Sequence, residues 1–287
     1  MKKRTILSLF LTAGLTLALT ACGTQPVEPT AEVKDETVVQ PAEETRPAEE
    51  AAAPTTEDEA VAGALLDPAG SGYSTGECSA EGHTILRAVP EGDTVVVYAQ
   101  CSTGNYGFVN GNFEEVSGSG AIPCRLTFAR DSDGGLTLTE FWEPEDGSRY
   151  AESIKENYPA DLVTQAMNAD YSELLPQKEA YARAYLEKIG REAEVGEFAD
   201  FDHSLPTDRG MSVEVSNALL GLEELSCYPF FLGEEERIED GVRWVYRNAW
   251  EPSDDGGTAT YTKMNYDTGE IAEQFVYRVT GDTFEKV

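Results

Sequence analysis

The stretch HTILRAVPEGDTVVVYAQC, residues 83–101, decides the fold because its side chains alternate with a period of two around a turn. Val95, Val97 and Ala99 occupy alternate positions, which is typical of a strand whose two faces have different surroundings. The preceding Pro90-Glu91-Gly92-Asp93 has the residue types of a turn. The stretch therefore predicts an antiparallel hairpin.

The hairpin pattern continues downstream. Residues 106–109 and 112–116 flank Asn110-Gly111, a dipeptide suited to a type I′ turn. Residues 122–130 and 135–142 form another such pair around residues 131–134. The first half of the chain therefore predicts an antiparallel meander.

Helix spacing replaces strand spacing after residue 147. Helices are expected at residues 153–158, 160–168 and 176–191, and a further one near residues 212–222. Four strands are expected after it, at residues 241–251, 258–266, 270–279 and 283–287. The predicted class is α+β, with antiparallel sheets and a few helices.

A polar segment divides the folded part. Residues 192–210 are broken by Gly196 and Pro206, which favours a boundary between two small subdomains. We expect a first domain at residues 63–195, made of the meander and the helices that follow it. A second domain, a helix with a four-stranded sheet, is expected at residues 196–287.

The tripeptide Trp-Glu-Pro occurs twice, at residues 142–144 and 250–252. Proline cannot donate to a sheet ladder, so both copies are expected to end a strand. The segments that follow the two copies differ, which favours a repeated turn over a duplicated domain.

Residues 1–21 have the pattern of a secretory signal peptide. Met-Lys-Lys-Arg precedes an apolar run from Thr5 to Ala18, which is too short to span a bilayer as a stable helix. The run ends in Leu-Thr-Ala-Cys, residues 19–22, which resembles the lipobox of bacterial lipoproteins. The resemblance implies cleavage before Cys22 and attachment of lipid to its thiol.

Residues 22–62 predict a disordered acidic tether behind the lipidated cysteine. Between residues 23 and 62 there are eleven acidic residues against Lys34 and Arg46, five prolines and no aromatic residue. Such a segment buries too little apolar surface to offset its conformational entropy. With the lipid anchor, the tether places the folded part at the outer face of the cell membrane.

The charge of the chain restricts its partners. The formal net charge is −32 at pH 7, which repels nucleic acid and favours neutral or cationic partners. An alternative is that the acidic side chains simply keep the surface solvated. We expect no nucleic-acid partner.

Four cysteines remain besides Cys22, and an even number in an exported chain favours disulfides. Cys101 and Cys124 end one predicted strand and begin the next, so we expect them to pair across the loop between them. Cys78 and Cys227 would then pair by elimination.

Tyr106, Phe108 and Phe113 are the candidate binding residues. They lie in a glycine-rich stretch, residues 102–124, where exposed rings could form a recognition surface. The alternative is that the rings face the core of the sheet.

No catalytic or metal-binding constellation emerges from the sequence. Ser74 lies in a Gly-x-Ser-x-Gly match but has no preceding buried strand, so it does not predict a nucleophile. His83 lacks metal-ligand spacing, and Asp200, Asp202 and His203 are more typical of a solvated loop than of a cation site. We expect no catalytic residue, metal or cofactor.

A second resemblance bears on function. The stretches YGFVNGNFEEVSGSGAIPCRLTF, residues 106–128, and LTEFWEPEDGSRYAESIKENYP, residues 138–159, are similar to the extracytoplasmic part of beta-lactam-sensor-type membrane metallopeptidases and to small lipoproteins. The similarity spans Gly82 to Pro159, but the chain lacks their metallopeptidase motif and any membrane span beyond the signal. The resemblance implies a binding or sensing module for an envelope protein or peptide. The alternatives are a wall- or glycan-modifying enzyme with carboxylates that no motif identifies, and a structural or inhibitory envelope protein.

The lipobox predicts that Cys22→Ala releases the protein from the membrane, because acyl chains on this thiol would supply its membrane affinity. Membrane fractionation measures the release, and mass spectrometry of the mature N-terminus checks the modification. A free Cys22 thiol, or cleavage at another position, would contradict the prediction.

Overall fold

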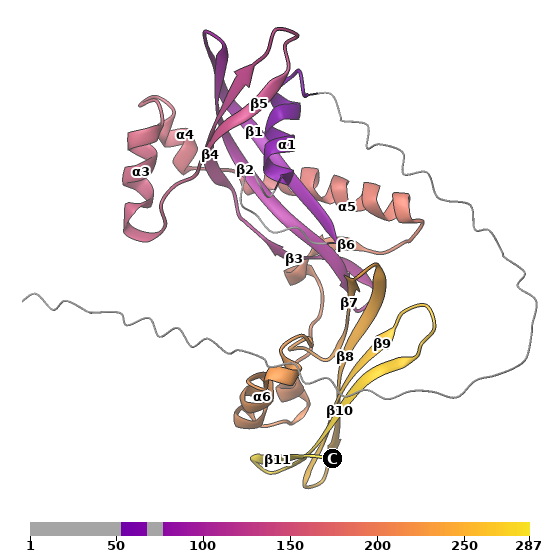
Figure 1. The fold of residues 1–287 in the computed structure, drawn as a ribbon. Helices are drawn as coiled ribbons and strands as arrows, with labels where there is room; N and C mark the ends of the chain where they lie inside the picture. Colours follow the sequence, from indigo (N-terminus) through magenta and orange to yellow (C-terminus); the bar gives the residue numbers. More distant parts are fainter. Residues whose placement is uncertain (1–52, 68–76) are drawn as a thin grey trace, which may run out of the picture. The chain divides into compact units, whose positions relative to one another are not determined.

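The computed structural model describes residues 53–67 and 77–287. Their eleven strands form one sheet, in which every pairing is antiparallel except that of β3 with β6 (Figure 1). The predicted antiparallel sheets with a few helices are confirmed, with strand predominating over helix. None of the helices in these ranges is long and apolar enough to cross a membrane.

Strand β2 (Thr94–Val109) is the centre of the first half. It pairs with β1 (Cys78–Glu91), and Glu91 lies opposite Thr94 across a turn in which Gly92 has a φ of 65°. Because only glycine adopts this left-handed backbone without strain, the turn falls at Gly92. The predicted hairpin is confirmed.

The second predicted turn is also confirmed. Asn110 and Gly111 both have positive φ, 49° and 84°, as a type I′ turn requires, and they join β2 to β3 (Asn112–Gly118). The strands expected to end at residue 101 and to begin at residue 106 are one strand, because β2 runs without a break from Thr94 to Val109. The meander is completed by β4 (Ile122–Arg130) and β5 (Leu136–Trp142).

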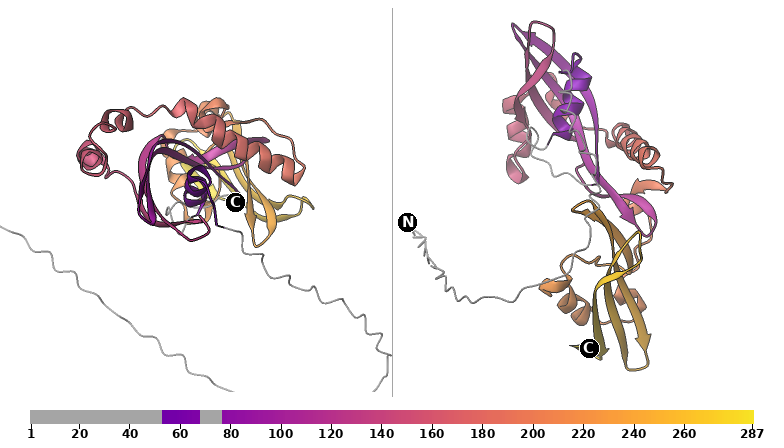
Figure 2. Two further views of the ribbon diagram at one scale, coloured as in Figure 1. Left: turned by 90° about the horizontal axis from the view of Figure 1, so that it is seen from above. Right: turned by 45° about the vertical axis from the view of Figure 1, so that its right-hand side comes forward.

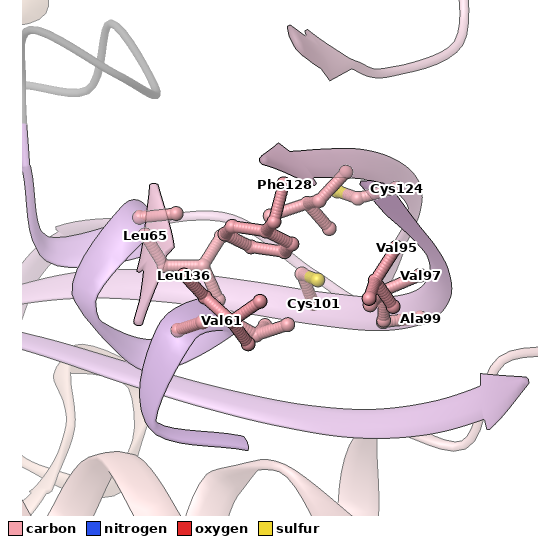
Figure 3. Packing of buried hydrophobic residues seen from close by; sticks show 12 residues of the cluster. Val61, Leu65, Val95, Val97, Ala99, Cys101, Cys124, Phe128 and Leu136 are labelled. Atoms are coloured by element: carbon pink, nitrogen blue, oxygen red, sulfur yellow. The ribbon is translucent and has the colours of Figure 1, made fainter. Parts of the chain in front are cut away.

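Helix α1 (Glu57–Leu66) covers one face of β2. Its buried residues Val61 and Leu65 join a core that contains Val95, Val97 and Ala99, the residues whose alternation predicts the strand (Figure 3). Figure 2 shows the strands of the first half curled around this helix. The alternation therefore reflects burial of one strand face against a helix.

The tether expectation is corrected for residues 57–62, which belong to helix α1. Thr56 and Glu59 form a capping box: the amide of Glu59 donates to the hydroxyl of Thr56 over 3.2 Å, and the carboxylate of Glu59 accepts from the amide of Thr56. The apolar run that follows supplies the buried face. Residues 22–52 of the predicted tether lie outside the described residues.

Helices that follow the meander cover the other face of β2 and part of β1. Tyr98 of β2 packs against a cluster that contains Ile154 and Tyr158. The helices after the meander are α3 (Tyr150–Asn157), α4 (Val163–Met167) and α5 (Leu175–Ile189), with short 3-10 turns at Gly147–Arg149 and Tyr171–Glu173. The three helices predicted for this region are confirmed with shifted ends.

The second half has a separate hydrophobic core, made of residues from Met211 to Phe284. The elements that form this core are all expected from the sequence: α6 (Val213–Leu220), β8 (Val242–Ser253), β9 (Gly256–Asn265), β10 (Ile271–Thr280) and β11 (Thr283–Lys286). Strand β7 (Gly233–Glu239) was not expected. The segment before this core contains β6 (Val195–Glu197) and 3-10 turns at Phe198–Asp200 and Pro206–Arg209, and another turn lies at Glu223–Leu225.

The two Trp-Glu-Pro copies differ in their surroundings. The first ends β5 at Trp142, as predicted. The second lies at the end of β8, which stops at Ser253, one residue after Pro252, so this expectation is confirmed with a slightly shifted end. Gly257 of β9 lies opposite Pro252, and the indole of Trp250 packs so closely over it that a Cβ at this position would lie 2.4 Å from the ring.

Candidate functional site

The candidate site is a groove beside strand β7, which we call the β7 groove. It consists of two cavities of about 510 and 450 Å³ that share Val116, Glu235 and Arg237 in their walls. The first cavity extends along β7 toward Glu77 and Ile238, and the second extends toward the loop that carries Phe230. The groove is defined by the following residues: Glu77, Tyr106, Gly107, Val109, Val116, Phe198, Leu220, Leu225, Ser226, Tyr228, Pro229, Phe230, Phe231, Glu235, Glu236, Arg237 and Ile238.

Large apolar side chains are unusually accessible in this groove. Phe230 is 49% exposed, Ile238 48%, Val116 44% and Leu220 42%. These four residues come from a loop, from β7, from β3 and from α6, so the fold assembles them from distant parts of the sequence. A concentration of exposed apolar side chains in a hollow of the surface is the usual signature of an interaction site.

An ion pair of β7 lies between the two cavities. The guanidinium of Arg237 donates to both carboxylate oxygens of Glu235, over 2.9 and 3.2 Å. The guanidinium also lies 5.1 Å from the ring centre of Tyr246. Both charged groups are partly exposed, so the groove presents a fixed pair of opposite charges between apolar walls.

An aromatic cluster forms the far wall of the second cavity. Phe198 stacks on His203 with ring centres 3.7 Å apart and planes 8° apart, and Phe231 meets His203 edge-on at 5.0 Å. Phe230 contacts Phe231 at 5.4 Å. The exposed Phe230 therefore stands on a rigid stack of rings.

A buried hydrogen bond holds the aromatic cluster to strand β3. His203 Nε2 lies 2.8 Å from a carboxylate oxygen of Glu114, and Asn112 donates to the other oxygen over 3.3 Å. Burial raises the pKa of the Glu114 carboxyl, and His203 and Asn112 offset part of this rise. The side chain of Asn248 in β8 donates to the carbonyl of Pro229 over 3.0 Å, which holds the loop that carries Phe230.

Strand β7 is attached to β2 at one end. Val109 lies opposite Glu235, the amide of Asn110 donates to the carbonyl of Glu234 over 2.9 Å, and the amide of Glu234 donates to the side-chain oxygen of Asn110 over 2.8 Å. Gly233 makes this approach possible: its φ is 136°, and a Cβ there would lie 1.9 Å from the Asn110 side-chain oxygen.

A charge network connects β7 to the first half. Arg243 of β8 binds Glu77 through both terminal nitrogens, over 2.6 and 2.9 Å, and also contacts Glu236 over 2.9 Å. Arg191 binds both oxygens of Glu236 over 2.6 and 2.9 Å. The guanidinium of Arg191 lies 3.4 Å from the ring centre of Phe108, so it covers this ring in a cation–π contact.

The predicted binding residues are buried. Tyr106, Phe108 and Phe113 are at most 1% exposed. Phe113 stacks against Tyr185 of α5 with ring centres 5.6 Å apart. The prediction of an exposed recognition surface is therefore wrong, and the rings face the core, which was the alternative.

The predicted disulfides are not formed among the described cysteines, which are free thiols. Cys124 lies opposite Ala99, and Cys101 lies opposite Ile122, so the first pair meets diagonally. Both belong to the core under α1, where burial raises the pKa of the Cys101 thiol well above its ordinary value (Figure 3). Cys78 belongs to the core under α5, whereas Cys227 packs against the core of the second half. Cys22 lies outside the described residues, as does Ser74.

The titratable residues weighed for metal binding have structural partners. His83 lies 2.9 Å from Glu81, His203 contacts Glu114, and Asp200 accepts from the amide of Glu197 over 2.9 Å. Within residues 53–67 and 77–287, no group of three or more histidine, cysteine or acidic side chains is placed to hold a metal ion.

Comparison of the chain with protein-family models, curated proteins and solved structures finds no match. The groove must therefore be interpreted from its own chemistry. Sequence reasoning missed it because β7, GEEERIE, lacks apolar alternation. One signal was present: Asp240-Gly241 follows directly, and both residues have positive φ, 51° and 78°, as in a hairpin turn.

Gly233→Ala tests the attachment of β7. We expect it to lower the free energy of unfolding by about 1–3 kcal/mol, because its backbone conformation disfavours a side chain and the added Cβ displaces Asn110. Gly120→Ala is the control, since a Cβ at Gly120 meets no atom within 4 Å. Urea denaturation measures both, and equal stability of the two variants would contradict this role of Gly233.

Proposed function

We propose that the chain is a lipid-anchored lipoprotein on the outer face of the cell membrane, and that its folded part binds an envelope polypeptide in the β7 groove. The proposed anchor is supported by the signal pattern and the Leu-Thr-Ala-Cys motif at residues 19–22. Of the residues expected from the sequence, the buried Tyr106 lies in the wall of this groove, whereas Phe108 and Phe113 do not line it.

The observation that carries the binding role is the concentration of accessible apolar side chains in one groove of a very acidic chain. A formal charge of −32 keeps such a chain soluble and separate from other acidic molecules. Val116, Leu220 and Phe230 are at least 42% exposed around the second cavity. Exposure of this kind is costly in water, and a partner that covers the groove would remove the cost.

The contacts that hold Phe230 in place support a binding role for the groove. Phe230 rests on Phe231 and the His203 stack, and Asn248 fixes the adjoining backbone at Pro229. Because these contacts already order the ring, a partner would lose little affinity to ordering it. An aromatic side chain held in this way is a common energetic centre of protein interfaces.

Photo-crosslinking in intact cells tests the proposal. A photoreactive amino acid at Phe230 should form a crosslink to an envelope polypeptide that disappears when Leu220 is also changed to Asp. The matched control is Ile271, which is 54% exposed but lines neither cavity. Absence of a crosslink at Phe230, or the same crosslink from Ile271, would contradict the proposal.

The same partner, once identified, allows a quantitative prediction. Phe230→Ala should weaken its binding by about 2 kcal/mol, roughly thirtyfold, because truncation of an aromatic anchor removes most of its contact area. Ile271→Ala should leave the affinity unchanged. Isothermal titration calorimetry of the Cys22→Ala chain with the purified partner measures both values.

A further inference from the structure

Arg209 differs from the other arginines of this acidic chain. Every other arginine in residues 53–67 and 77–287 forms an ion pair with an acidic side chain. Within the same ranges Arg209 forms none, although the chain carries 53 acidic residues against 21 lysines and arginines. Arg209 is exposed, so its guanidinium is open to a ligand.

Arg209 lines a cavity of about 380 Å³, which we call the Arg209 cavity. Its other lining residues are two polar and three apolar ones: Asp202, Ser204, Leu232, Trp250 and Pro252. The cavity shares no lining residue with the β7 groove. Its volume lies near the lower end of the range for small-ligand pockets, which is about 300–1,000 Å³, so it suits a small molecule.

The polar side chains of this cavity have no partners of their own. Among the residues that the structure describes, Asp202 and Ser204 form no ion pair or hydrogen bond through their side chains. Asp202 and Arg209 do not pair with each other either. In the β7 groove, by contrast, Glu235 and Arg237 are already paired. The Arg209 cavity therefore offers a ligand one negative and one positive group.

Hydrogen bonds hold the walls of the Arg209 cavity in place. The indole nitrogen of Trp250 donates to the carbonyl of Arg209 over 3.0 Å. The amide of Leu232 donates to the carbonyl of Ser204 over 2.8 Å. Because the backbone at Arg209 and Ser204 is already fixed, a ligand would lose little affinity to ordering it.

A small zwitterion matches the charges of the cavity. A guanidinium binds a carboxylate through two parallel hydrogen bonds, and the carboxylate of Asp202 can pair with an ammonium group. The formal charge of −32 opposes the approach of plain anions, so a ligand with a carboxylate is favoured when it also carries a positive charge. Leu232, Trp250 and Pro252 supply apolar surface for a side chain of the ligand.

We infer that the Arg209 cavity binds a free amino acid with an apolar side chain. Arg209 pairs with the carboxylate of the ligand and Asp202 with its ammonium group, and the hydroxyl of Ser204 supplies a further hydrogen bond. The inference does not depend on the proposed function, because the two sites share no lining residue.

Three ligands with the same apolar side chain test this recognition. L-leucine carries both charged groups, 3-methylbutylamine lacks the carboxylate, and 4-methylpentanoate lacks the ammonium group. Each is titrated into the full, isotope-labelled Cys22→Ala chain, and the resonance of the Trp250 indole N–H is followed. Leucine should give a saturable shift at millimolar concentration. Each analogue should bind about tenfold more weakly or worse, because it loses one charge-assisted hydrogen-bonded pair.

Two substitutions assign the charges. Arg209→Gln should remove the advantage of leucine over 3-methylbutylamine, and Asp202→Asn should remove its advantage over 4-methylpentanoate. Both residues are exposed, so both variants should fold, which circular dichroism checks. Glu187→Gln and Lys188→Gln are the matched controls, because these exposed residues of α5 line neither the Arg209 cavity nor the β7 groove. They should leave all three affinities unchanged.

Absence of a saturable shift with leucine at tens of millimolar would overturn the inference. Equal binding of leucine and both analogues, or unchanged ligand preference in the Arg209→Gln variant, would overturn the pairing of charges. Glucose is a neutral probe of similar size, and tighter binding of glucose than of leucine would assign the cavity to sugars instead. None of these results would bear on crosslinking at Phe230, so failure of this inference and failure of the proposed function are distinguishable.

Discussion

The placement of β7 depends on a network of two buried carboxylates and two partly exposed guanidinium groups. Glu77 and Glu236 alternate with Arg243 and Arg191, and the last of these lies on the ring of Phe108. The two carboxylates are at most 9% exposed. Because removing one member of such a network leaves a buried charge without a partner, at a cost of about 3–5 kcal/mol, the network permits few alternative arrangements of the strands that carry it. It holds β7 close to β2, and residues of both strands line the first cavity.

The β7 groove combines charged side chains of β7 with an apolar end formed by stacked rings. Glutamates crowd β7, and those at residues 234, 235 and 236 are each paired with an arginine, so the wall of the groove carries little unbalanced charge. The stacked rings around His203 and the hydrogen bond to Glu114 hold the apolar end of the groove in place. In the proposed function, the lipid anchor keeps this groove within reach of envelope polypeptides.

Local signals predicted much of the fold, and long-range contacts determined the site. The hairpins around Gly92 and Asn110-Gly111 and the helix capped by Ser212 follow from turn and capping chemistry, which a sequence displays directly. The buried orientation of Tyr106 and Phe108 required knowing that β2 continues to Val109 and that α5 covers it. The capping box of Thr56 and Glu59 is a local signal of the same kind for helix α1. No local pattern could bring Val116, Leu220, Phe230 and Ile238 together, because they share no element.

The most direct test of the account is a map of the contact surface by nuclear magnetic resonance. The isotope-labelled Cys22→Ala chain is titrated with the envelope polypeptide that crosslinks at Phe230, and backbone amide shifts are followed. Binding in the β7 groove predicts shift changes concentrated at residues 235–238, at Val116 and at residues 228–231, with β10 and β11 unaffected. Changes concentrated on β10 and β11, or spread evenly over the acidic surface, would contradict the claim that the β7 groove is the binding site.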